Sequence, residues 1–252
     1  MYDLQDVKSD DNLPLIVFAT IKSWNLNNVS AFAERWKSKY RTEIISDPEE
    51  LTYENLKLMN PDWVFFPHWS WIVSSEIHKN FSCVVFHITD LPFGRGGSPL
   101  QNLISRGIYR TKVSALKMTD EVDSGPIYMK HDLDISSGSA TEIFEEVSDI
   151  IFKNMIPEII SNRIDLEEQS GDITYFKRLN CESGNFNKEL PNSLDKAYDL
   201  IRMLDAEGYP RAFVTIGGLK IEFQGVNKHG DRMLKGEFII HLNQDVDKSS
   251  SS

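Results

Sequence analysis

The chain has 252 residues, a formal net charge of −11 and 40% hydrophobic residues. This length accommodates one α/β domain with a sizeable core and a smaller additional unit. The acidic balance disfavours a nucleic-acid partner, because the phosphate backbone requires a basic surface. The sequence contains no run of about 18 apolar residues, so we expect no transmembrane helix. Two cysteines without a metal-binding pattern, and an N-terminus without signal-peptide features, favour a cytoplasmic protein with no metal site.

Short apolar runs alternate with amphipathic segments through the first part of the chain. Strands are expected at 15–19, 43–45, 62–66 and 83–86, and helices at 31–36, 52–59 and 74–80. Asn27 or Asn28 is the expected cap of the first helix. Strands that alternate with helices at this spacing are typical of a Rossmann-like, doubly wound and mostly parallel α/β sheet. Ligands of such sheets bind beyond the carboxyl ends of the strands.

The central part of the chain predicts a strand pair and a long helix. Strand-like runs at 112–118 and 127–133 flank an acidic turn and are expected to pair at the edge of the sheet. Residues 139–142 form a capping box, which predicts a long helix that Pro157 kinks or ends. The polar segment 165–171 is typical of a linker between two parts of the chain.

The remaining sequence predicts a second, smaller unit that contains β-structure. The elements expected there are a helix at 194–205 and strands at 211–216, 219–223 and 237–242. We therefore predict an N-terminal catalytic domain at residues 1–170, a small C-terminal β-containing subdomain at 171–245 and a disordered tail at 246–252.

His87 stands at the end of an apolar run and precedes a glycine-rich loop and a helix start. A histidine ordinarily has a pKa near 6.5, which suits proton transfer near neutral pH. Taken alone, His87 is equally compatible with a buried structural role, and the glycines with a tight turn. Further along, Asp123 lies in an acidic turn that ends in Gly125-Pro126, where it is also compatible with a turn cap.

The two motifs together resemble those of the folate-dependent formyltransferases. They read H-x-x-D-L-P-x-x-R-G-G-x-P-x-Q from His87 and V-D-x-G-P-I from Val122, and the resemblance covers residues 15–133 with a weaker similarity after Leu194. It implies that His87 and Asp123 are catalytic and that 10-formyltetrahydrofolate is the co-substrate, with no metal. The co-substrate contacts that it implies are Trp71, Ile72, Glu121, Val122 and Asp123. The implied substrate contacts are Thr89, Arg95, Gly96, Gly97, Gln101 and Asn102.

One position departs from the family pattern. The family usually has an asparagine two residues before the histidine, where it helps to hold the oxyanion of the tetrahedral intermediate. Val85 stands at this position and cannot donate a hydrogen bond. Another donor is then needed, because losing one oxyanion donor typically lowers the rate about 100- to 1000-fold. The candidate donors are Thr89, the Asn102 amide and the backbone N–H groups of residues 89–97. Two roles are open for His68: a second proton carrier, or a packed loop residue.

The segment that begins at Phe86 is most similar to formyltransferases of bacterial surface-sugar pathways, particularly those of the pseudaminic or nonulosonic acid type. This similarity implies N-formylation of a nucleotide-linked amino sugar in surface-glycan biosynthesis, with UDP as the expected nucleotide. The acidic charge and the short C-terminal region favour such a small acceptor over tRNA. A formyltetrahydrofolate hydrolase and a non-catalytic folate-binding relative are the alternatives. Relatives of the sugar branch use a small C-terminal β unit for packing or dimer contacts, so a homodimer is one possible assembly.

Overall fold

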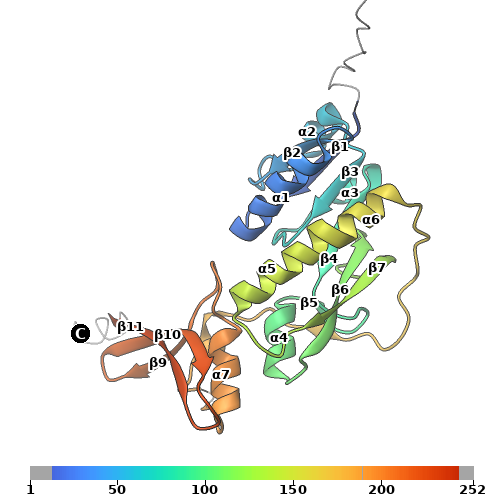
Figure 1. Cartoon of the computed structure of the whole chain (residues 1–252). Helices are drawn as coiled ribbons and strands as arrows, with labels where there is room; N and C mark the ends of the chain where they lie inside the picture. Colours follow the sequence, from blue (N-terminus) through green and yellow to red (C-terminus); the bar gives the residue numbers. More distant parts are fainter. Residues whose placement is uncertain (1–12, 189, 244–252) are drawn as a thin grey trace, which may run out of the picture. The chain divides into compact units, whose positions relative to one another are not determined.

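The computed structural model describes residues 13–188 and 190–243 (Figure 1). Contacts within the chain group it into two interleaved compact units. Unit 1 comprises Met1–His87, Val113–His131 and Val147–Gly171, and unit 2 comprises Ile88–Lys112, Asp132–Glu146 and Asp172–Ser252. The domain division at residues 170 and 171 stays a prediction, and the tail expected at 246–252 lies outside the described residues.

The largest sheet has six strands in the order β2-β1-β3-β4-β6-β7. The strands are β1 (Leu15–Ala19), β2 (Arg41–Ile45), β3 (Trp63–Phe66), β4 (Cys83–His87), β6 (Arg110–Lys117) and β7 (Ile127–Asp134). The strands β1 to β4 pair in parallel, whereas β6 runs antiparallel to β4. The predicted mostly parallel α/β fold is therefore confirmed, and the strand pair expected at the sheet edge is present as β6 and β7.

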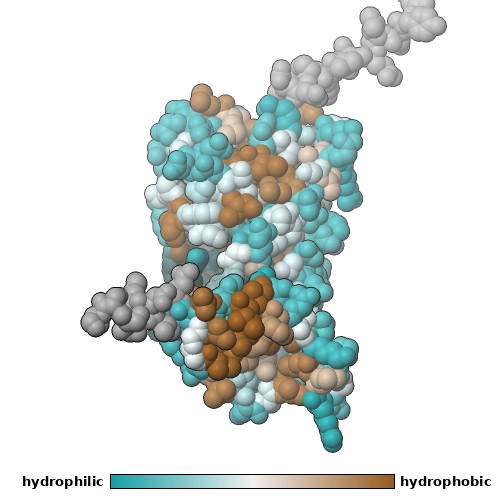
Figure 2. Space-filling view, turned by 90° about the vertical axis from the view of Figure 1, so that its left-hand side faces the viewer, coloured by the Kyte–Doolittle hydropathy of each residue, from teal (hydrophilic) through white to brown (hydrophobic). Residues whose placement is uncertain are grey.

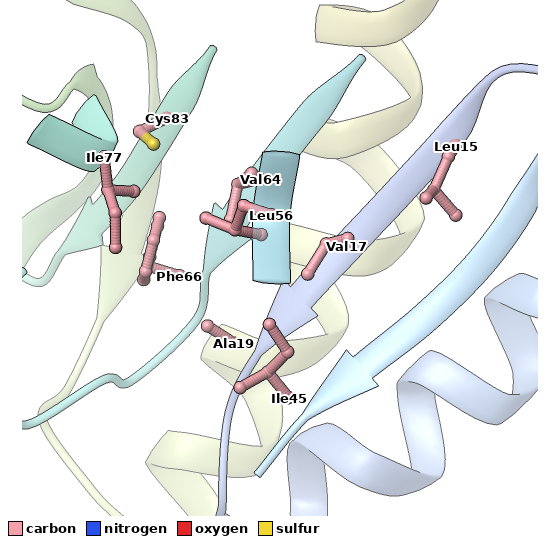
Figure 3. Packing of buried hydrophobic residues seen from close by; sticks show 9 residues of the cluster. All are labelled: Leu15, Val17, Ala19, Ile45, Leu56, Val64, Phe66, Ile77 and Cys83. Atoms are coloured by element: carbon pink, nitrogen blue, oxygen red, sulfur yellow. The ribbon is translucent and has the colours of Figure 1, made fainter. Parts of the chain in front are cut away.

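Apolar side chains cover both faces of this sheet because successive strand residues point in opposite directions. On one face, Leu56 of α2 (Tyr53–Met59) and Ile77 of α3 (Ser75–Asn80) join a buried cluster with the strand residue Val17 (Figure 3). On the other face, the Phe18 ring lies 5.3 Å from Phe32 and 5.2 Å from Phe152. The core of unit 1 thus sits in two layers, one on each side of β1.

The first helix is longer than predicted. It spans Ser23–Trp36 (α1) and follows Lys22, which forms no side-chain cap. The predicted cap Asn28 is therefore a residue of the helix interior, and its Nδ2 donates to Ser148 at 2.9 Å. The buried Asn25 likewise donates to the Pro67 carbonyl at 3.0 Å. These tertiary hydrogen bonds outweigh the preference of asparagine for caps and extend the helix towards its N-terminus.

The predicted capping box is present at the start of α5 (Ala140–Ile150). The Glu142 N–H donates to Ser139 Oγ, and the Ser139 N–H donates to the Glu142 carboxylate. Pro157 is predicted to kink or end the last turn of this helix, and α6 (Ile156–Ser161) continues for only four residues beyond it. A π-helical turn, η2 (Ile151–Met155), precedes the proline. Such a turn widens the helix where the proline cannot donate a backbone hydrogen bond.

Unit 2 contains the C-terminal β-structure that the sequence predicts. Its three-stranded antiparallel sheet has the order β11-β10-β9, with β9 (Ala212–Ile216), β10 (Leu219–Lys228) and β11 (Leu234–Leu242). The short strands β5 (Arg95–Gly96) and β8 (Tyr175–Phe176) pair in parallel, and the remaining elements are α4 (Pro99–Ser105), η3 (Cys181–Gly184) and α7 (Leu194–Arg202). No helix among the described residues is long and apolar enough to cross a membrane.

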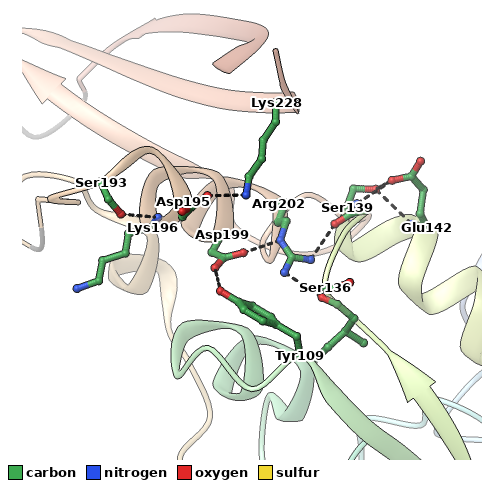
Figure 4. A network of polar contacts seen from close by, with 12 residues as sticks. Tyr109, Ser136, Ser139, Glu142, Ser193, Asp195, Lys196, Asp199, Arg202 and Lys228 are labelled. Carbon is green, nitrogen blue, oxygen red and sulfur yellow. Dashed lines mark hydrogen bonds and ion pairs between the residues drawn. The ribbon is translucent and has the colours of Figure 1, made fainter. Parts of the chain in front are cut away.

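A buried arginine ties α7 to two other segments of unit 2 (Figure 4). The Arg202 guanidinium donates to the Asp199 carboxylate at 2.7 Å and to the carbonyls of Gly138 and Ile135 at 3.0 and 2.9 Å. The Tyr109 hydroxyl donates to the same carboxylate at 2.6 Å. This hydrogen bond, together with burial, raises the pKa of Tyr109 to about 12. The charge of Arg202 is thus balanced by Asp199, as a buried cation requires.

Candidate active site

The predicted catalytic pair meets in unit 1. His87 is the last residue of β4, and its Nδ1 lies 3.4 Å from Oδ2 of Asp123 in the loop 118–126. The two side chains are only 7% and 14% exposed. An imidazole whose Nδ1 faces a carboxylate is held in one orientation, with Nε2 left as the second ring nitrogen. The arrangement can therefore accept and return a proton at a fixed position.

The loop 118–126 has to run back along β4 to reach the histidine. Lys117, the last residue of β6, pairs with Val84, whereas His87 pairs with Ser114. The loop thus starts about 10 Å from the end of β4 that carries His87, because a strand rises about 3.3 Å per residue. The position of Asp123 depends on how this loop is held.

Two residues of the loop have demanding backbone positions. Asp123 has φ of +54°, in the left-handed region that non-glycine residues rarely adopt. Gly125 packs so closely on the Lys117 carbonyl that a Cβ at this position would overlap the oxygen. The glycine of the D-x-G motif is therefore required for packing, which explains its place beside the carboxylate.

The residues implied to bind the co-substrate include several exposed apolar side chains of unit 1. Trp71 and Ile72, in the segment after β3, are 44% and 87% exposed, and Val122 is 53% exposed. The Trp71 ring lies 5.0 Å from the ring of Trp69. Exposed aromatic and aliphatic groups of this kind fit the apolar faces of a flat heterocycle such as a pterin. Their role in binding, like that of the exposed Glu121, stays a prediction.

Val85 occupies the same face of β4 as His87, because alternate residues of a strand share a face. Its half-buried side chain packs against the apolar cluster that contains Cys83 and Phe66. An asparagine in its place would leave its amide next to this cluster. The apolar surroundings at position 85 thus suit a valine. The hydrogen-bond donor to the oxyanion has to be another residue.

The glycine-rich loop belongs to unit 2, where its close neighbour is another segment of the chain. A Cβ at Gly94 would lie 2.6 Å from the Phe176 ring, and one at Gly96 would lie 2.6 Å from the Phe176 carbonyl oxygen. A Cβ at Gly97 would lie 2.7 Å from Cβ of Arg178. These glycines therefore permit close packing on the strand β8 and the residues after it. Substrate contact by Gly96 and Gly97 stays a prediction.

The amides of Gln101 and Asn102 are engaged inside unit 2. Asn102 Nδ2 donates to the carbonyls of Gly97, Ser98 and Lys177 at 2.9–3.1 Å. Gln101 Nε2 donates to the Met203 carbonyl at 3.0 Å. We therefore no longer consider the Asn102 amide as the oxyanion donor.

Two further predicted contacts of unit 2, Thr89 and Arg95, are buried, at 0% and 5% exposure. The Arg95 N–H donates to the Thr174 carbonyl at 2.9 Å, as part of the β5–β8 pairing. Their contacts with substrate stay predictions.

His68 follows β3 and has a positive φ of +57°. Burial, together with the nearby positive charge of Lys22, lowers the pKa of His68 to about 4. Its imidazole lies 5.5 Å from the Trp24 ring, in an edge-to-face arrangement. A histidine with this pKa is neutral at pH 7, which favours the packed role over that of a proton carrier.

Gln169 is a site residue that the sequence analysis missed. Its Nε2 donates to the carbonyls of Asp123 and Gly125, both at 2.8 Å. It lies in the segment predicted to be a linker, and no local pattern distinguishes it from the polar residues around it. Only the three-dimensional structure places it against the loop of the catalytic carboxylate.

Unit 2 also contains a pocket of about 560 Å³. It is lined by Thr141, Asp205, Ala206, Glu207, Gly208, Tyr209, Pro210, Arg211 and Glu222, none of which is a predicted site residue. Within the described part of the chain, no group of three or more His, Cys, Asp or Glu side chains is arranged to hold a metal ion.

Comparisons with known proteins agree with the fold. The C-terminal domain model of methionyl-tRNA formyltransferases matches residues 182–241. A solved structure of a methionyl-tRNA formyltransferase from Clostridium thermocellum is 48% identical, with a TM-score of 0.87, and the match covers 91% of this chain and 100% of that chain. A sugar N-formyltransferase from a Shewanella species has a TM-score of 0.62 at 16% identity, over 88% of this chain and 99% of that chain, which shows a shared fold.

Curated sequences give matches of lower identity. The methionyl-tRNA formyltransferase of Thermodesulfovibrio yellowstonii is 27% identical over 168 residues, which are 63% of this chain and 54% of that protein. The chain thus spans about half the length of the curated relatives it matches. The 48% identity over the full length of the Clostridium structure is sufficient to assign the family. The chain belongs to the folate-dependent formyltransferase family.

Proposed function

We propose that this protein transfers a formyl group from 10-formyltetrahydrofolate to the amine of a nucleotide-linked amino sugar. The observation that carries the proposal is the buried contact of His87 Nδ1 with Asp123 Oδ2 at 3.4 Å, at the end of β4. Membership of the folate-dependent family supports the co-substrate, and the exposed apolar side chains of Trp71, Ile72 and Val122 fit its ring.

In the proposed reaction, the neutral amine nitrogen attacks the formyl carbon, and a new C–N bond forms. His87 Nε2 accepts the proton that the amine nitrogen loses, while Asp123 orients the ring through Nδ1 and stabilises its protonated form. The bond between the formyl carbon and the folate nitrogen then breaks, and His87 returns the proton to that nitrogen. Such proton transfer contributes about 100- to 10,000-fold in rate. Holding the two substrates together contributes a further large part.

The oxyanion of the intermediate needs a donor other than residue 85. Thr89 and the backbone N–H groups of residues 89–91 and 96 stay as our candidates. The Asn102 amide and the N–H groups of residues 93, 94, 95 and 97 donate to other groups of the chain. Protonated His87 is a further donor to the oxyanion once it has accepted the amine proton.

The charge of the chain supports a small acceptor. The net charge of −11 disfavours a large polyanion such as tRNA. The pseudaminic or nonulosonic type of sugar, and UDP as its nucleotide, stay predictions from the motif. A second candidate acceptor is the amine of methionyl-tRNA, because the 48% identical Clostridium protein is a methionyl-tRNA formyltransferase.

The decisive experiment offers both acceptors with 10-formyltetrahydrofolate and identifies the products by mass spectrometry. We expect a formylated nucleotide sugar with the wild-type protein and none with His87→Asn, which should still bind tetrahydrofolate. If formyl-methionyl-tRNA is the sole product, the acceptor is methionyl-tRNA and the proposed sugar acceptor is wrong. Free formate without any formylated acceptor would indicate the hydrolase, and folate binding without turnover would indicate the non-catalytic relative.

We further propose that the three-stranded sheet forms a homodimer. Residues paired in register lie on the same side of an antiparallel sheet, so one face is apolar where β10 runs from Leu219 to Phe223. This face consists of Ala212, Val214 and Ile216 of β9, Leu219, Ile221 and Phe223 of β10, and Phe238, Ile240 and Leu242 of β11. Phe238 and Leu242 are 64% and 81% exposed, and Figure 2 shows the apolar patch on this surface. A second copy offers the same uncharged face, and sheet-on-sheet packing would bury both.

Sedimentation velocity tests the dimer. We expect the wild-type protein to sediment as a dimer, and the variant with Phe238→Lys and Leu242→Lys to sediment as a monomer. Glu237→Lys is the matched control, because it adds the same charge on the opposite face of β11. A wild-type protein that stays monomeric at all accessible concentrations would rule out this interface.

A further inference from the structure

The segment 165–171 is held against unit 1 by backbone and side-chain hydrogen bonds. Glu167 exchanges two backbone hydrogen bonds with Ile127 at the start of β7, at 2.7 and 3.0 Å. This short antiparallel pairing brings the side chain of Gln169, two residues later, to the loop 118–126. A flexible linker would make no such paired contact, so the segment has a structural task at the edge of the sheet.

Gln169 holds the backbone on both sides of Ser124. Its Nε2 donates to the Asp123 carbonyl and to the Gly125 carbonyl, both at 2.8 Å. A glutamine amide has two N–H groups, so each carbonyl receives one of them. Two short bonds from one nitrogen fix both the position and the direction of the intervening peptide units.

The loop requires support from outside at this point. Asp123 has a positive φ, a conformation that costs energy and persists where the surroundings enforce it. The hydroxyls of Thr119 and Ser124 both donate to the Glu121 carbonyl, at 3.1 and 2.8 Å, but these bonds stay inside the loop. They shape the loop without fixing it to the rest of unit 1.

A second external contact lies at the other end of the loop. The Asp120 carboxylate is 2.9 Å from Lys79 Nζ and 3.4 Å from His78 Nε2. Asp120 is 63% exposed, and exposed ion pairs of this type hold side chains weakly. Gln169, by contrast, acts directly on the backbone of the Asp123 segment.

We propose that Gln169 is a positioning residue, which sets the Asp123 carboxylate against His87 by fixing the backbone of residues 123–125. The catalytic consequence rests on the proposed function, whereas the effect on the loop does not. Gln169→Leu removes both donors and keeps a side chain of similar length. Glu168→Ala is the matched control, because it alters the exposed neighbouring residue and leaves both hydrogen bonds in place.

The first readout is hydrogen exchange of the backbone amides of residues 119–125, which requires no activity. We expect Gln169→Leu to speed exchange of this loop by at least about tenfold, with the rest of unit 1 unchanged, and Glu168→Ala to match the wild type. Equal exchange in both variants would overturn the proposal, whether or not the protein proves to be a formyltransferase.

The second readout is steady-state kinetics with the acceptor found in the product assay. We expect kcat of Gln169→Leu to fall about 10- to 100-fold, because a displaced catalytic group costs up to this much, while KM for the acceptor stays within about twofold. A merely structural role would instead lower the melting temperature and leave kcat per folded molecule unchanged, and that result would contradict positioning. Absence of turnover in the wild type would contradict the proposed function and leave the hydrogen-exchange result to decide the proposal.

Discussion

The loop 118–126 of unit 1 and the glycine-rich loop with α4 of unit 2 carry the two halves of the same family motif, yet they use their polar groups differently. In unit 1, the side chains of His87 and Asp123 face each other. In unit 2, the amide nitrogens of Gln101 and Asn102 donate to backbone carbonyls of unit 2 itself. A sequence motif can thus contain both residues that carry out the reaction and residues that stabilise the fold. The sequence of the motif does not distinguish the two kinds.

Gly125→Ala should produce the largest effect, since it tests whether the unit 1 loop tolerates any change in packing. The added Cβ would overlap the Lys117 carbonyl oxygen. We expect a loss of stability on the order of 3 kcal/mol and loss of turnover, because the backbone next to Asp123 has to move. Denaturant unfolding measures the stability. Gly218→Ala is the control, since nothing lies within 4 Å of a Cβ at that position and its φ is not positive.

Asn102→Ala tests the scaffold side of the comparison. It removes the side-chain donor that the carbonyls of Gly97, Ser98 and Lys177 share, although the Ser98 carbonyl still accepts from the Asn102 backbone N–H. We expect a stability loss of about 1–2 kcal/mol, since a lost hydrogen bond costs about 0.5–1.5 kcal/mol and these groups are partly exposed to water. Turnover per folded molecule should stay within a few-fold of the wild type. Loss of kcat at full stability would instead make Asn102 a candidate oxyanion donor again.

The strands, the sheet class and the pairing of His87 with Asp123 could be predicted from the sequence, because apolar periodicity and the two motifs are local signals. The start of α1 could not, since Asn25 and Asn28 form tertiary hydrogen bonds to Pro67 and Ser148. Gln169 could not either, because its partners lie more than 40 positions away in the chain. Local patterns thus predict where helices and strands occur. Hydrogen bonds between segments distant in the chain determine where these helices and strands end and which residues support the site.

His68 allows a pH test of the segment after β3. Its pKa is about 4 in the folded protein and near 6.5 in the unfolded chain, so the unfolded state binds more protons between these values. Stability should therefore fall as the pH drops from 6.5 to 4, by about 3 kcal/mol from this residue. His68→Asn, which tolerates a positive φ, should flatten the curve in this window. An unchanged pH dependence of unfolding would show that His68 titrates normally.

The smallest expected effect concerns the other end of β4. Cys83 is buried, and burial raises its thiol pKa to about 12, whereas Cys181 is exposed. A thiol reagent at about pH 8 should thus modify Cys181 quickly and Cys83 only after unfolding. Mass spectrometry of the labelled protein distinguishes the two sites. Rapid labelling of Cys83 in the native protein would show that the start of β4 is accessible to solvent.

A double-mutant cycle on the catalytic pair asks whether His87 and Asp123 act as one unit. The single variants His87→Asn and Asp123→Asn should each lower kcat/KM by about 100- to 10,000-fold. We expect the double variant to lose no more than the worse single variant, because the second change removes nothing that still functions. Losses that multiply in the double variant would contradict the proposed mechanism, since they would show that the two residues act independently.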